Sequence, residues 1–586
     1  MTFIERPHEN EKTRALTYVS KLLEDAINSK EDRTEDIKEL EDIQKLLSQK
    51  KYGLVWEQHA EKFEEDMKFN IPVFVENKSK KFHNDNNSSK FNFLLEGDNL
   101  HSLHLLEKTH LEKIDIIYID PPYNTGNKDF FYHDDFVDNT DEFKHSKWLS
   151  FMERRLKIAN RLIKNDGIIF ISIGDEEFAQ LKLLCDEIFG LNSFRENIMV
   201  EISSTTGMKV ATAKKGGIVK NGEYILVYSK SDLVSTNRKP LYDFVPGFDT
   251  HFTLFLSNEG VISKTVDVIT STPEIVSEFD RLKSDNEKLN LKTFSKYLNQ
   301  SSIFMDFVIE NIKSFARLRT EVPTIPNEII KSLEEGKWVE WTSLKREEPY
   351  YLTLYNGEIA NLATMESTYH NTDDFKSIYG RSIIRGDFWK NFWIDMGNIG
   401  KEGGVSFKNG KKPIRLIKQL LKWANRPEGM VLDFFAGSGT TGDAVSQMNN
   451  ENSSYNQNFI LSTNDEVIDT TYQRMKYINH KTPLNLKYFK TELIDKQSDD
   501  LENRLLNNVK TLIELKHGID LTNSDVAIVI KRSNLKELDI SELTTIYMRS
   551  QTHKMLNRQE LEELKEIKII DIPETFFPLE MKEAGL

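Results

Sequence analysis

The chain has 586 residues, of which 38% are hydrophobic and 29% are charged. This balance excludes a disordered chain, and the length predicts about two to four domains rather than one. The formal net charge of −15 argues weakly against a nucleic-acid binder whose whole surface is basic.

Cysteine content and hydrophobic runs exclude further classes. The single cysteine, Cys185, rules out an internal disulfide and a cysteine-built zinc site, and no metal site is expected. No apolar run is long enough to span a membrane, and the N-terminus lacks a signal-peptide pattern. A cytoplasmic location is therefore expected.

The charges are unevenly distributed along the chain. Acids exceed bases at both ends, whereas residues 202–222 contain lysines and no acid, and residues 401–426 contain eight bases and one acid. Basic inner stretches suit a protein that binds DNA. Solvated loops and helix faces carry similar runs, so neither stretch decides the matter by itself.

The N-terminal part reads as a helical extension followed by a linker. Residues 11–68 have a weak helical periodicity with many acid–base neighbours, which predicts a helical extension over 1–80. Residues 82–90 are polar and predict a linker.

From residue 91 strands and helices alternate, which predicts the first part of a catalytic α/β domain over 90–230. The predicted strands are Phe91–Glu96, Ile114–Ile119, Gly167–Ile173, Glu196–Ser203 and Glu223–Tyr228. The predicted helices are His101–Lys108, Phe143–Lys164 and Glu176–Phe189.

The alternation stops between residues 231 and 395, which are irregular, rich in aromatic residues and free of repeats. This segment is interpreted as an inserted domain. The alternation resumes over 400–490, with helices at Pro413–Ala424 and Asp465–Asn479 and strands at Met430–Phe435 and Asn458–Thr463. Residues 491–586 form a mixed C-terminal extension.

Five predicted strands precede the insertion and two follow it. This arrangement predicts a doubly wound, Rossmann-like α/β sheet of seven strands that is circularly permuted and interrupted by the insertion.

The first chemical motif, Asp120-Pro121-Pro122-Tyr123, ends the predicted strand Ile114–Ile119. The carboxylate of Asp120 and the carbonyl of Pro121 can accept the two N–H bonds of an exocyclic amino group. Pro122 confines Pro121 to extended conformations, and Tyr123 offers a flat face for stacking. The tetrapeptide is short enough to occur by chance, so it needs a second motif to support it.

That second motif is a glycine-rich turn between a strand and a helix. It consists of Asp433, Phe434, Phe435, Ala436, Gly437, Ser438, Gly439, Thr440 and Thr441. Glycines let the backbone approach a ligand closely, and the helix N-terminus offers free N–H groups to an anion. No lysine follows Gly442, so the turn does not match a nucleotide P-loop.

The two motifs together resemble those of the S-adenosylmethionine-dependent amino methyltransferases of DNA. The Asp-Pro-Pro-Tyr tetrad precedes the Phe-x-Gly-x-Gly turn, which is the order of that superfamily's beta group. The resemblance is closer still to the modification subunit of type III restriction–modification systems, over Phe93–Leu100, Asp120–Gly126 and Leu432–Gly442. It covers 90–230 and 400–490 and is thin over 491–586.

The resemblance implies a site-specific DNA adenine N6-methyltransferase that transfers a methyl group from S-adenosylmethionine to a flipped adenine. It implies double-stranded DNA as substrate, a homodimer, an ATP-dependent restriction subunit as partner, and a target-recognition domain over 231–395. The C-terminal extension would then serve dimer or partner contacts. The implied catalytic residues are Asp120, Pro121, Pro122 and Tyr123. The implied cofactor-binding residues are Asp98, Asn99, Lys412, Pro413, Asp433, Phe434, Phe435, Ala436, Gly437, Ser438, Gly439, Thr440, Thr441 and Thr463.

Two of these positions have a second interpretation. Asp98 would also serve as the N-cap of the helix His101–Lys108. Thr463 stands where the family pattern has an acid or amide for the ribose hydroxyls, so Asn464, Asp465 or Glu466 would take that part. Asp465 equally suits a helix cap.

Other functions remain open at this point. A solitary DNA adenine methyltransferase without a restriction partner fits the same motifs. A DNA-binding adaptor with incidental methylation is less favoured because both motifs are intact. Protein or ribosomal substrates usually go with Asn-Pro-Pro-Tyr, and cytosine with Ser at position 120, so both are disfavoured.

Overall fold

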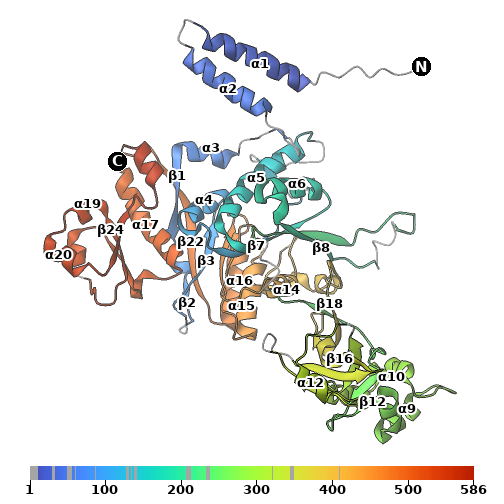
Figure 1. The fold of residues 1–586 in the computed structure, drawn as a ribbon. Helices are drawn as coiled ribbons and strands as arrows, with labels where there is room; N and C mark the ends of the chain where they lie inside the picture. Colours follow the sequence, from blue (N-terminus) through green and yellow to red (C-terminus); the bar gives the residue numbers. More distant parts are fainter. Residues whose placement is uncertain are drawn as a thin grey trace, which may run out of the picture.

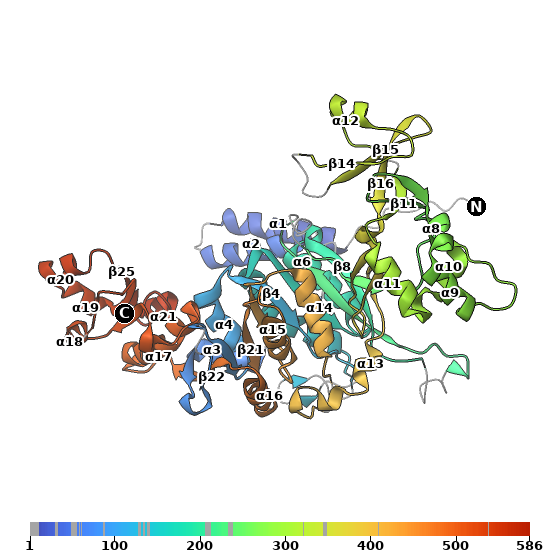
Figure 2. The ribbon, with the colours of Figure 1, turned by 90° about the horizontal axis from the view of Figure 1, so that it is seen from below.

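The computed structural model describes residues 11–29, 33–48, 56–57, 59, 61–85, 88–126, 131–132, 135–136, 141–205, 213–231, 238–319, 321–343, 349–407, 410–536 and 538–585. A central α/β unit is assembled from segments on both sides of an inserted domain (Figure 1). The inserted domain and a small C-terminal unit lie at opposite ends of this central unit (Figures 1 and 2).

The central sheet has the strand order β1-β22-β3-β21-β20-β4-β7-β9-β8-β19, with β2 paired to β22. Its strands are β1 (Asn70–Glu76), β2 (Phe82–His83), β3 (Asn92–Glu96), β4 (Ile114–Ile119), β7 (Ile163–Ile173), β8 (Phe194–Glu201), β9 (Gly222–Tyr228), β19 (Phe388–Trp389), β20 (Met430–Asp433), β21 (Asn458–Thr463) and β22 (Asn485–Asp495). The seven predicted strands form its contiguous middle, β3-β21-β20-β4-β7-β9-β8. The predicted doubly wound fold is confirmed.

Both faces of this sheet are covered by helices and buried. Successive residues of a strand point to opposite faces, so each strand contributes side chains to two cores. Ile117 and Ile119 of β4 enter the core beneath α4 (Asn99–His110), α5 (Lys144–Leu162) and α6 (Phe178–Phe189). Ile116 enters the core on the other face, beneath α14 (Ile414–Ala424), α15 (Thr440–Glu451) and α16 (Ile468–Lys481). This two-sided burial explains why the strand sequences are almost continuously apolar.

The sheet is wider than the seven strands that the sequence predicts. The N-terminal segment contains helices α1 (Glu11–Ile27), α2 (Thr34–Ser48) and α3 (Lys62–Phe69), as expected, but then enters the sheet as β1. Strand β1 pairs antiparallel with β22, so the expectation of a purely helical extension is wrong for Asn70–Glu76. Pro72 hides this strand in the sequence, since proline is tolerated in strands mainly at a sheet edge.

The inserted domain is regular, contrary to its irregular appearance in the sequence. Its larger sheet has the order β12-β11-β13-β16-β15-β14 and its smaller sheet the order β10-β18-β17. The strands are β10 (Tyr242–Phe244), β11 (Leu254–Leu256), β12 (Ile262–Lys264), β13 (Phe315–Arg319), β14 (Val339–Trp341), β15 (Tyr350–Tyr355), β16 (Glu358–Thr364), β17 (Tyr369–Asn371) and β18 (Tyr379–Ile384). The helices are α8 (Thr265–Ser271), α9 (Pro273–Leu282), α10 (Leu291–Tyr297), α11 (Ser302–Glu310) and α12 (Asn327–Ser332).

The exit of the inserted domain is part of the central sheet. Strand β19 runs parallel to β8, with Phe388 opposite Met199 and Trp389 opposite Val200. The short helix α13 (Trp393–Met396) then leads toward α14. The insertion is therefore joined to the central unit by strand pairing as well as by its two chain crossings.

The C-terminal segment continues the central core. Helix α17 (Leu501–His517) buries its apolar residues in the same core as β1 and α4. Beyond it lies a small parallel sheet of β23 (Val526–Val529), β24 (Thr545–Arg549) and β25 (Lys568–Ile572). Helices α18 (Arg532–Leu535), α19 (Ser550–Lys554), α20 (Arg558–Glu563) and α21 (Pro578–Glu583) accompany this sheet. No helix in the described part of the chain is long and apolar enough to cross a membrane.

Candidate active site

The two motifs lie side by side at the carboxyl edge of the central sheet. Strands β4 and β20 are parallel neighbours, with Leu432 opposite Ile117. The segments that follow them, Asp120–Tyr123 and the glycine turn, therefore emerge at the same edge, where doubly wound sheets bind their ligands.

Hydrogen bonds to Trp148 of α5 and to Glu177 fix the tetrad and the residue that follows it. Trp148 Nε1 donates to the Pro122 carbonyl at 2.7 Å, and Asn124 Nδ2 donates to the buried Glu177 Oε1 at 2.6 Å. Among the described residues, no hydrogen bond is made to the Pro121 carbonyl. The tetrad is thus fixed through its second proline, and the carbonyl of its first proline stays available.

The Tyr123 ring packs against Gly174, which follows the neighbouring strand β7. A Cβ at Gly174, directly after β7, would lie 2.9 Å from Cδ2 of the Tyr123 ring and 2.5 Å from Glu176 Oε2. Real Cβ atoms do not approach other atoms so closely, so only glycine leaves room for the ring. The Tyr123 hydroxyl donates to Glu223 Oε2 at 3.0 Å.

Lys412 reaches into the tetrad from the segment before α14. Its Nζ lies 2.6 Å from Glu223 Oε2 and 2.6 Å from the Tyr123 hydroxyl. The same Nζ is 3.3 Å from Asp120 Oδ1, an ion-pair distance. Asp120 Oδ1 is nevertheless a buried acceptor without an aligned hydrogen-bond donor among the described residues. Lys412 compensates the charge of Asp120 and leaves its hydrogen-bonding capacity unused.

Burial dominates the electrostatics of this edge. The pKa of Asp120 is raised to about 6, chiefly by burial, while the charge of Lys412 opposes the rise and that of Glu223 adds to it. Burial likewise raises the pKa of Asp433 to about 7, with a contribution from the charge of Asp120. Two carboxyl groups with raised pKa values in one cleft are typical of a functional site.

The glycine turn is organised by Asp433. Its Oδ1 accepts from the Phe435 N–H at 3.0 Å and its Oδ2 from Thr441 Oγ1 at 2.5 Å. Gly437 and Gly439 have φ angles of 49° and 77°, a region that side chains disfavour. The N-cap of α15, Gly439, provides no side-chain hydrogen bond, so the first N–H groups of this helix remain available for a ligand.

Four other predicted turn residues are buried. Thr440 Oγ1 and Ser438 Oγ are 3.1 Å apart, and buried Arg474 donates to Thr440 Oγ1 at 2.9 Å. Ala436 and Phe434 are buried as well. Phe435 and Gly437 are only half-buried, so among the turn residues they are the most accessible to a ligand.

Asp98 and Asn99 lie where β3 meets α4. The Asp98 side chain accepts from the Leu100 N–H at 2.7 Å, so it does cap α4. Asn99 Nδ2 donates to the Phe434 carbonyl at 2.8 Å, which joins α4 to the glycine turn. Arg155 of α5, fully buried, donates to Asn99 Oδ1 at 2.5 Å and to both carboxylate oxygens of Glu61.

Thr463 and Pro413 also lie at this edge. Thr463 is opposite Glu96 of β3, and its carbonyl accepts from the Gly97 N–H at 3.1 Å. The three residues after it are exposed, and α16 begins at Ile468 with Val467 as N-cap, so the expectation that Asp465 caps this helix is wrong. Pro413 is the N-cap of α14.

Four residues that position this site escaped the sequence analysis: Trp148, Arg155, Gly174 and Glu223. Each lies far along the chain from the motif residue that it contacts. Gly174 alone left a signal, since a glycine directly after a buried strand indicates a close approach. Nothing in the local sequence around Glu223 distinguishes it from an ordinary strand-end acid.

The basic stretch 401–426 is mostly satisfied within the protein. Lys411 donates to two carbonyls, and Lys412 binds Glu223. Four more pair as Arg415–Asp395, Lys418–Glu451, Lys422–Asp373 and Arg426–Asp166, and Lys408 lies outside the described residues. This stretch is therefore chiefly a set of inward ion pairs rather than an open basic surface.

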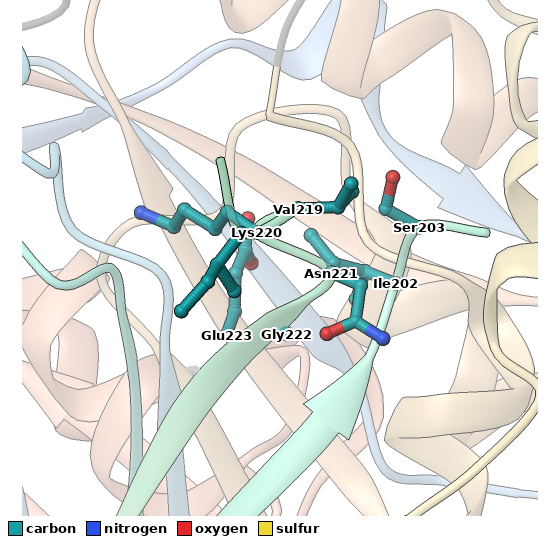
Figure 3. A pocket seen from close by; sticks show the side chains of 8 residues that line it. Ile202, Ser203, Val219, Lys220, Asn221, Gly222 and Glu223 are labelled. Atoms are coloured by element: carbon teal, nitrogen blue, oxygen red, sulfur yellow. The ribbon is translucent and has the colours of Figure 1, made fainter. Parts of the chain in front are cut away.

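A pocket of about 360 Å³ opens beside the tetrad, at the start of β9 (Figure 3). It is lined by Ile202, Ser203, Ile218, Val219, Lys220, Asn221, Gly222 and Glu223. Ile218 is 97% exposed, and Lys214 and Lys215 nearby are exposed too. Residues 206–212 of the basic stretch 202–222 lie outside the described residues. Of the two basic stretches, this one presents the more open charge next to the site.

Known proteins resemble this chain in sequence. A family model described as DNA methylase matches residues 114–472. The Mod subunit of the type III restriction–modification enzyme EcoPI, from Escherichia phage P1, is 29% identical over 72% of this chain and 65% of its own length. The type II methyltransferase M.KpnI, from Klebsiella pneumoniae, is 29% identical over 68% of this chain and 90% of its own length.

A third relative is the Mod subunit of the type III enzyme StyLTI, from Salmonella typhimurium. It is 30% identical over 65% of this chain and 54% of its own length. The chain therefore spans between about half and two thirds of the length of these two type III relatives, and most of the type II relative.

Proposed function

This chain belongs to the DNA methylase family, and on that basis we propose that it is a site-specific DNA adenine N6-methyltransferase that uses S-adenosylmethionine. One observation carries the proposal. A buried carboxylate oxygen, Asp120 Oδ1, lacks an aligned donor, and the neighbouring Pro121 carbonyl is unbonded among the described residues. Two acceptors match the two N–H bonds of an exocyclic amino group.

The glycine turn fits the proposed cofactor. The half-buried Phe435 and Gly437 are accessible to a ligand, and the uncapped N-terminus of α15 offers N–H groups to a carboxylate. Asp98, Asn99 and Thr463 lie at the ends of the adjoining elements and would complete the site. Their roles toward the cofactor are part of the proposal.

S-adenosylmethionine, when bound, supplies an electrophilic methyl group. The amino group of adenine is a poor nucleophile because its lone pair is delocalised into the ring. Hydrogen bonds to Asp120 and to the Pro121 carbonyl favour a pyramidal nitrogen whose lone pair is free to react. The protein's part is then positioning and charge stabilisation, and Asp120 acts as an acceptor rather than as a strong base.

The target base must leave the duplex to reach Asp120. Its extrusion costs a few kcal/mol, and stacking on an aromatic ring returns about 1–3 kcal/mol. Tyr123, half-buried and held by Glu223 and Gly174, is the ring we assign to this stacking. The exposed lysines beside the pocket would contact the DNA phosphates.

The biological setting is also a proposal. The type III relatives are Mod subunits, which supports a modification subunit of such a system. We propose in addition that it reads DNA through its inserted domain, forms a homodimer and works with a restriction subunit in the cytoplasm. The type II relative supports the alternative, a methyltransferase without such a partner. Identifying the protein encoded next to this one separates the two, because only the first requires an ATP-dependent restriction subunit there.

The central test is Asp120→Ala in the full-length protein. Methyl transfer to DNA should be abolished while DNA binding, measured by electrophoretic mobility shift, stays within about threefold of wild type, because Asp120 contacts the base and not the phosphates. Single-molecule sequencing of DNA from cells with and without the gene would identify the modified base. Retained turnover in the variant, or methylation of cytosine instead of adenine, would contradict the proposal.

A further inference from the structure

Glu223 and Lys412 form a charged group inside the proposed transfer centre that the reaction itself does not require. The Lys412 side chain is 10% exposed, the Glu223 side chain 21% and the Asp120 side chain 17%. Burying charged groups is unfavourable unless they are paired. Glu223 and Lys412 pair with each other, but burying both still costs free energy of folding. This cost suggests a role in the reaction rather than in stability.

The distances from Lys412 define that role. Its Nζ is 2.6 Å from the Tyr123 hydroxyl and 4.8 Å from the centre of the ring. It therefore lies near the hydroxyl end of the ring, within cation–π distance of the ring centre. Its approach to Asp120 Oδ1, at 3.3 Å, is an ion pair without an aligned hydrogen bond.

Glu223 fixes Lys412 in turn. Its Oε2 accepts from Lys412 Nζ at 2.6 Å and from the Tyr123 hydroxyl at 3.0 Å. Glu223 is placed by strand pairing, opposite Val200 of β8. The carboxylate, the ammonium group and the phenol form a closed triangle, and Asp120 lies against its lysine corner.

We propose that Glu223 and Lys412 are positioning residues of the transfer centre: Lys412 fixes Asp120 and Tyr123 relative to each other and keeps Asp120 charged, and Glu223 holds Lys412 in place. This inference rests on the proposed function and deepens it. It also assigns Lys412 to the pocket for the target base rather than to the methionine end of the cofactor.

The charges around Asp120 predict opposite effects for the two residues. Asp120 faces Lys412, Glu223, Tyr123, Tyr118 and Asp433. The pKa of Asp120, about 6, is lowered by Lys412 and raised by Glu223. Because the charged form of Asp120 is the active one, the methylation rate of the wild type should fall as the pH drops through about 6.

The experiment measures single-turnover methylation of target DNA as a function of pH. In Lys412→Met the acidic limb should move to higher pH by about one unit, which lowers the ionised fraction of Asp120 at pH 7, and with it the rate, by about twofold; this loss should be recovered at higher pH. In Glu223→Gln the limb should move to lower pH. Lys412→Arg should restore much of the rate, because it keeps the positive charge.

Lys418→Met is the matched control. Lys418 lies on the adjoining helix α14 and pairs with the exposed Glu451, so its removal should leave the profile unchanged. Cofactor affinity, measured by calorimetry, should change by less than about threefold in all four variants. A melting curve checks that each variant folds; if Lys412→Met does not, Glu223→Gln and Lys412→Arg decide the outcome.

Two results would overturn the inference. One is an acidic limb that stays in place in Glu223→Gln and Lys412→Met. The other is a loss of cofactor affinity of about tenfold or more in Lys412→Met, which would return Lys412 to the cofactor. A wild type that methylates no DNA would instead refute the proposed function. The Asp120 carboxyl would then be titrated by NMR in the wild type and in Lys412→Met, and an unshifted Asp120 would overturn the positioning role without any turnover.

Discussion

At the scale of single residues, the site carries a cost in folding free energy. Asp120 and Asp433 are carboxylates in surroundings that favour their neutral forms. Polar groups that are kept unsatisfied in a folded protein are retained for function rather than for stability. The unbonded Oδ1 of Asp120 is the clearest instance here.

Replacing Asp120 by Asn should therefore stabilise the protein while it inactivates the enzyme. The folded-state pKa of Asp120, about 6, exceeds its ordinary value of 3.8, so ionisation opposes folding at high pH and not below 3.8. The melting temperature of Asp120→Asn should exceed that of the wild type at pH 8 by a few degrees, a gain of about 2–3 kcal/mol at most.

The difference should shrink as the pH falls from 7 to 4, because the wild-type carboxyl group becomes protonated over that range. Differential scanning calorimetry across this range would measure it. A gain that is independent of pH, or a loss of stability at pH 8, would show that the carboxylate is not the source of the cost.

At the scale of elements, α4, α5 and the glycine turn are joined by one buried guanidinium group. Arg155 of α5 binds Glu61, which precedes α3, and Asn99 at the start of α4. Asn99 in turn binds the carbonyl of Phe434 in the glycine turn. The position of the turn, which follows the inserted domain in the chain, thus depends on helices that precede the inserted domain.

Arg155→Met should destabilise the protein strongly, by about 3–5 kcal/mol, because the buried Glu61 loses both hydrogen bonds to Arg155 and keeps the more distant Arg154, at 3.7 Å. Arg161→Met is the matched control on the same helix: its side chain is 50% exposed and pairs with Glu107, so the expected cost is about 0–1 kcal/mol. Thermal unfolding followed by circular dichroism compares the two. Equal shifts for both variants would contradict the role given to Arg155.

At the scale of the whole molecule, the C-terminal extension is part of the central fold rather than an appended module. Lys487 of β22, fully buried, pairs with Glu76 of β1, Glu514 of α17 and Asp520 beyond it. Helix α17 also covers the sheet with apolar residues. Dimer or partner contacts over 491–586, if formed, must use the outer surface of this segment.

A chain that ends at Asp495 should therefore fail to fold, because it loses α17 and exposes the core beneath it. The matched control is a chain that lacks residues 1–48, whose helices α1 and α2 pack on each other. We expect the control to be soluble and to bind S-adenosylmethionine, and the C-terminal truncation to aggregate. Solubility after expression and size-exclusion chromatography would measure the difference.

The sequence predicts the middle of the sheet and both motifs because these depend on local signals. An apolar run, a proline pair and a glycine turn are each visible within a few residues. The edge strands β1 and β19, and β22 beside β1, escape prediction because Pro72 and mixed charges interrupt their patterns. Gly174, Arg155 and Glu223 escape because their partners are distant in sequence. The number of bases in 401–426 suggested a possible DNA-binding surface, because a sequence does not show that most of these bases pair with acids of the same protein.

One row of the sheet connects recognition with chemistry. Val200 of β8 lies between Trp389, on the strand that leaves the inserted domain, and Glu223, which holds Lys412. Paired strands resist sliding past one another. A shift of the exit strand β19 would therefore strain its pairing with β8 and the pairing of β8 with β9, which places Glu223. Only one residue of this row, Val200, separates the exit strand of the inserted domain from the residue that would orient the reacting groups. Through this row, docking of the inserted domain on DNA would change the position of Glu223 and, through Lys412, the position of the groups that hold the reacting amine.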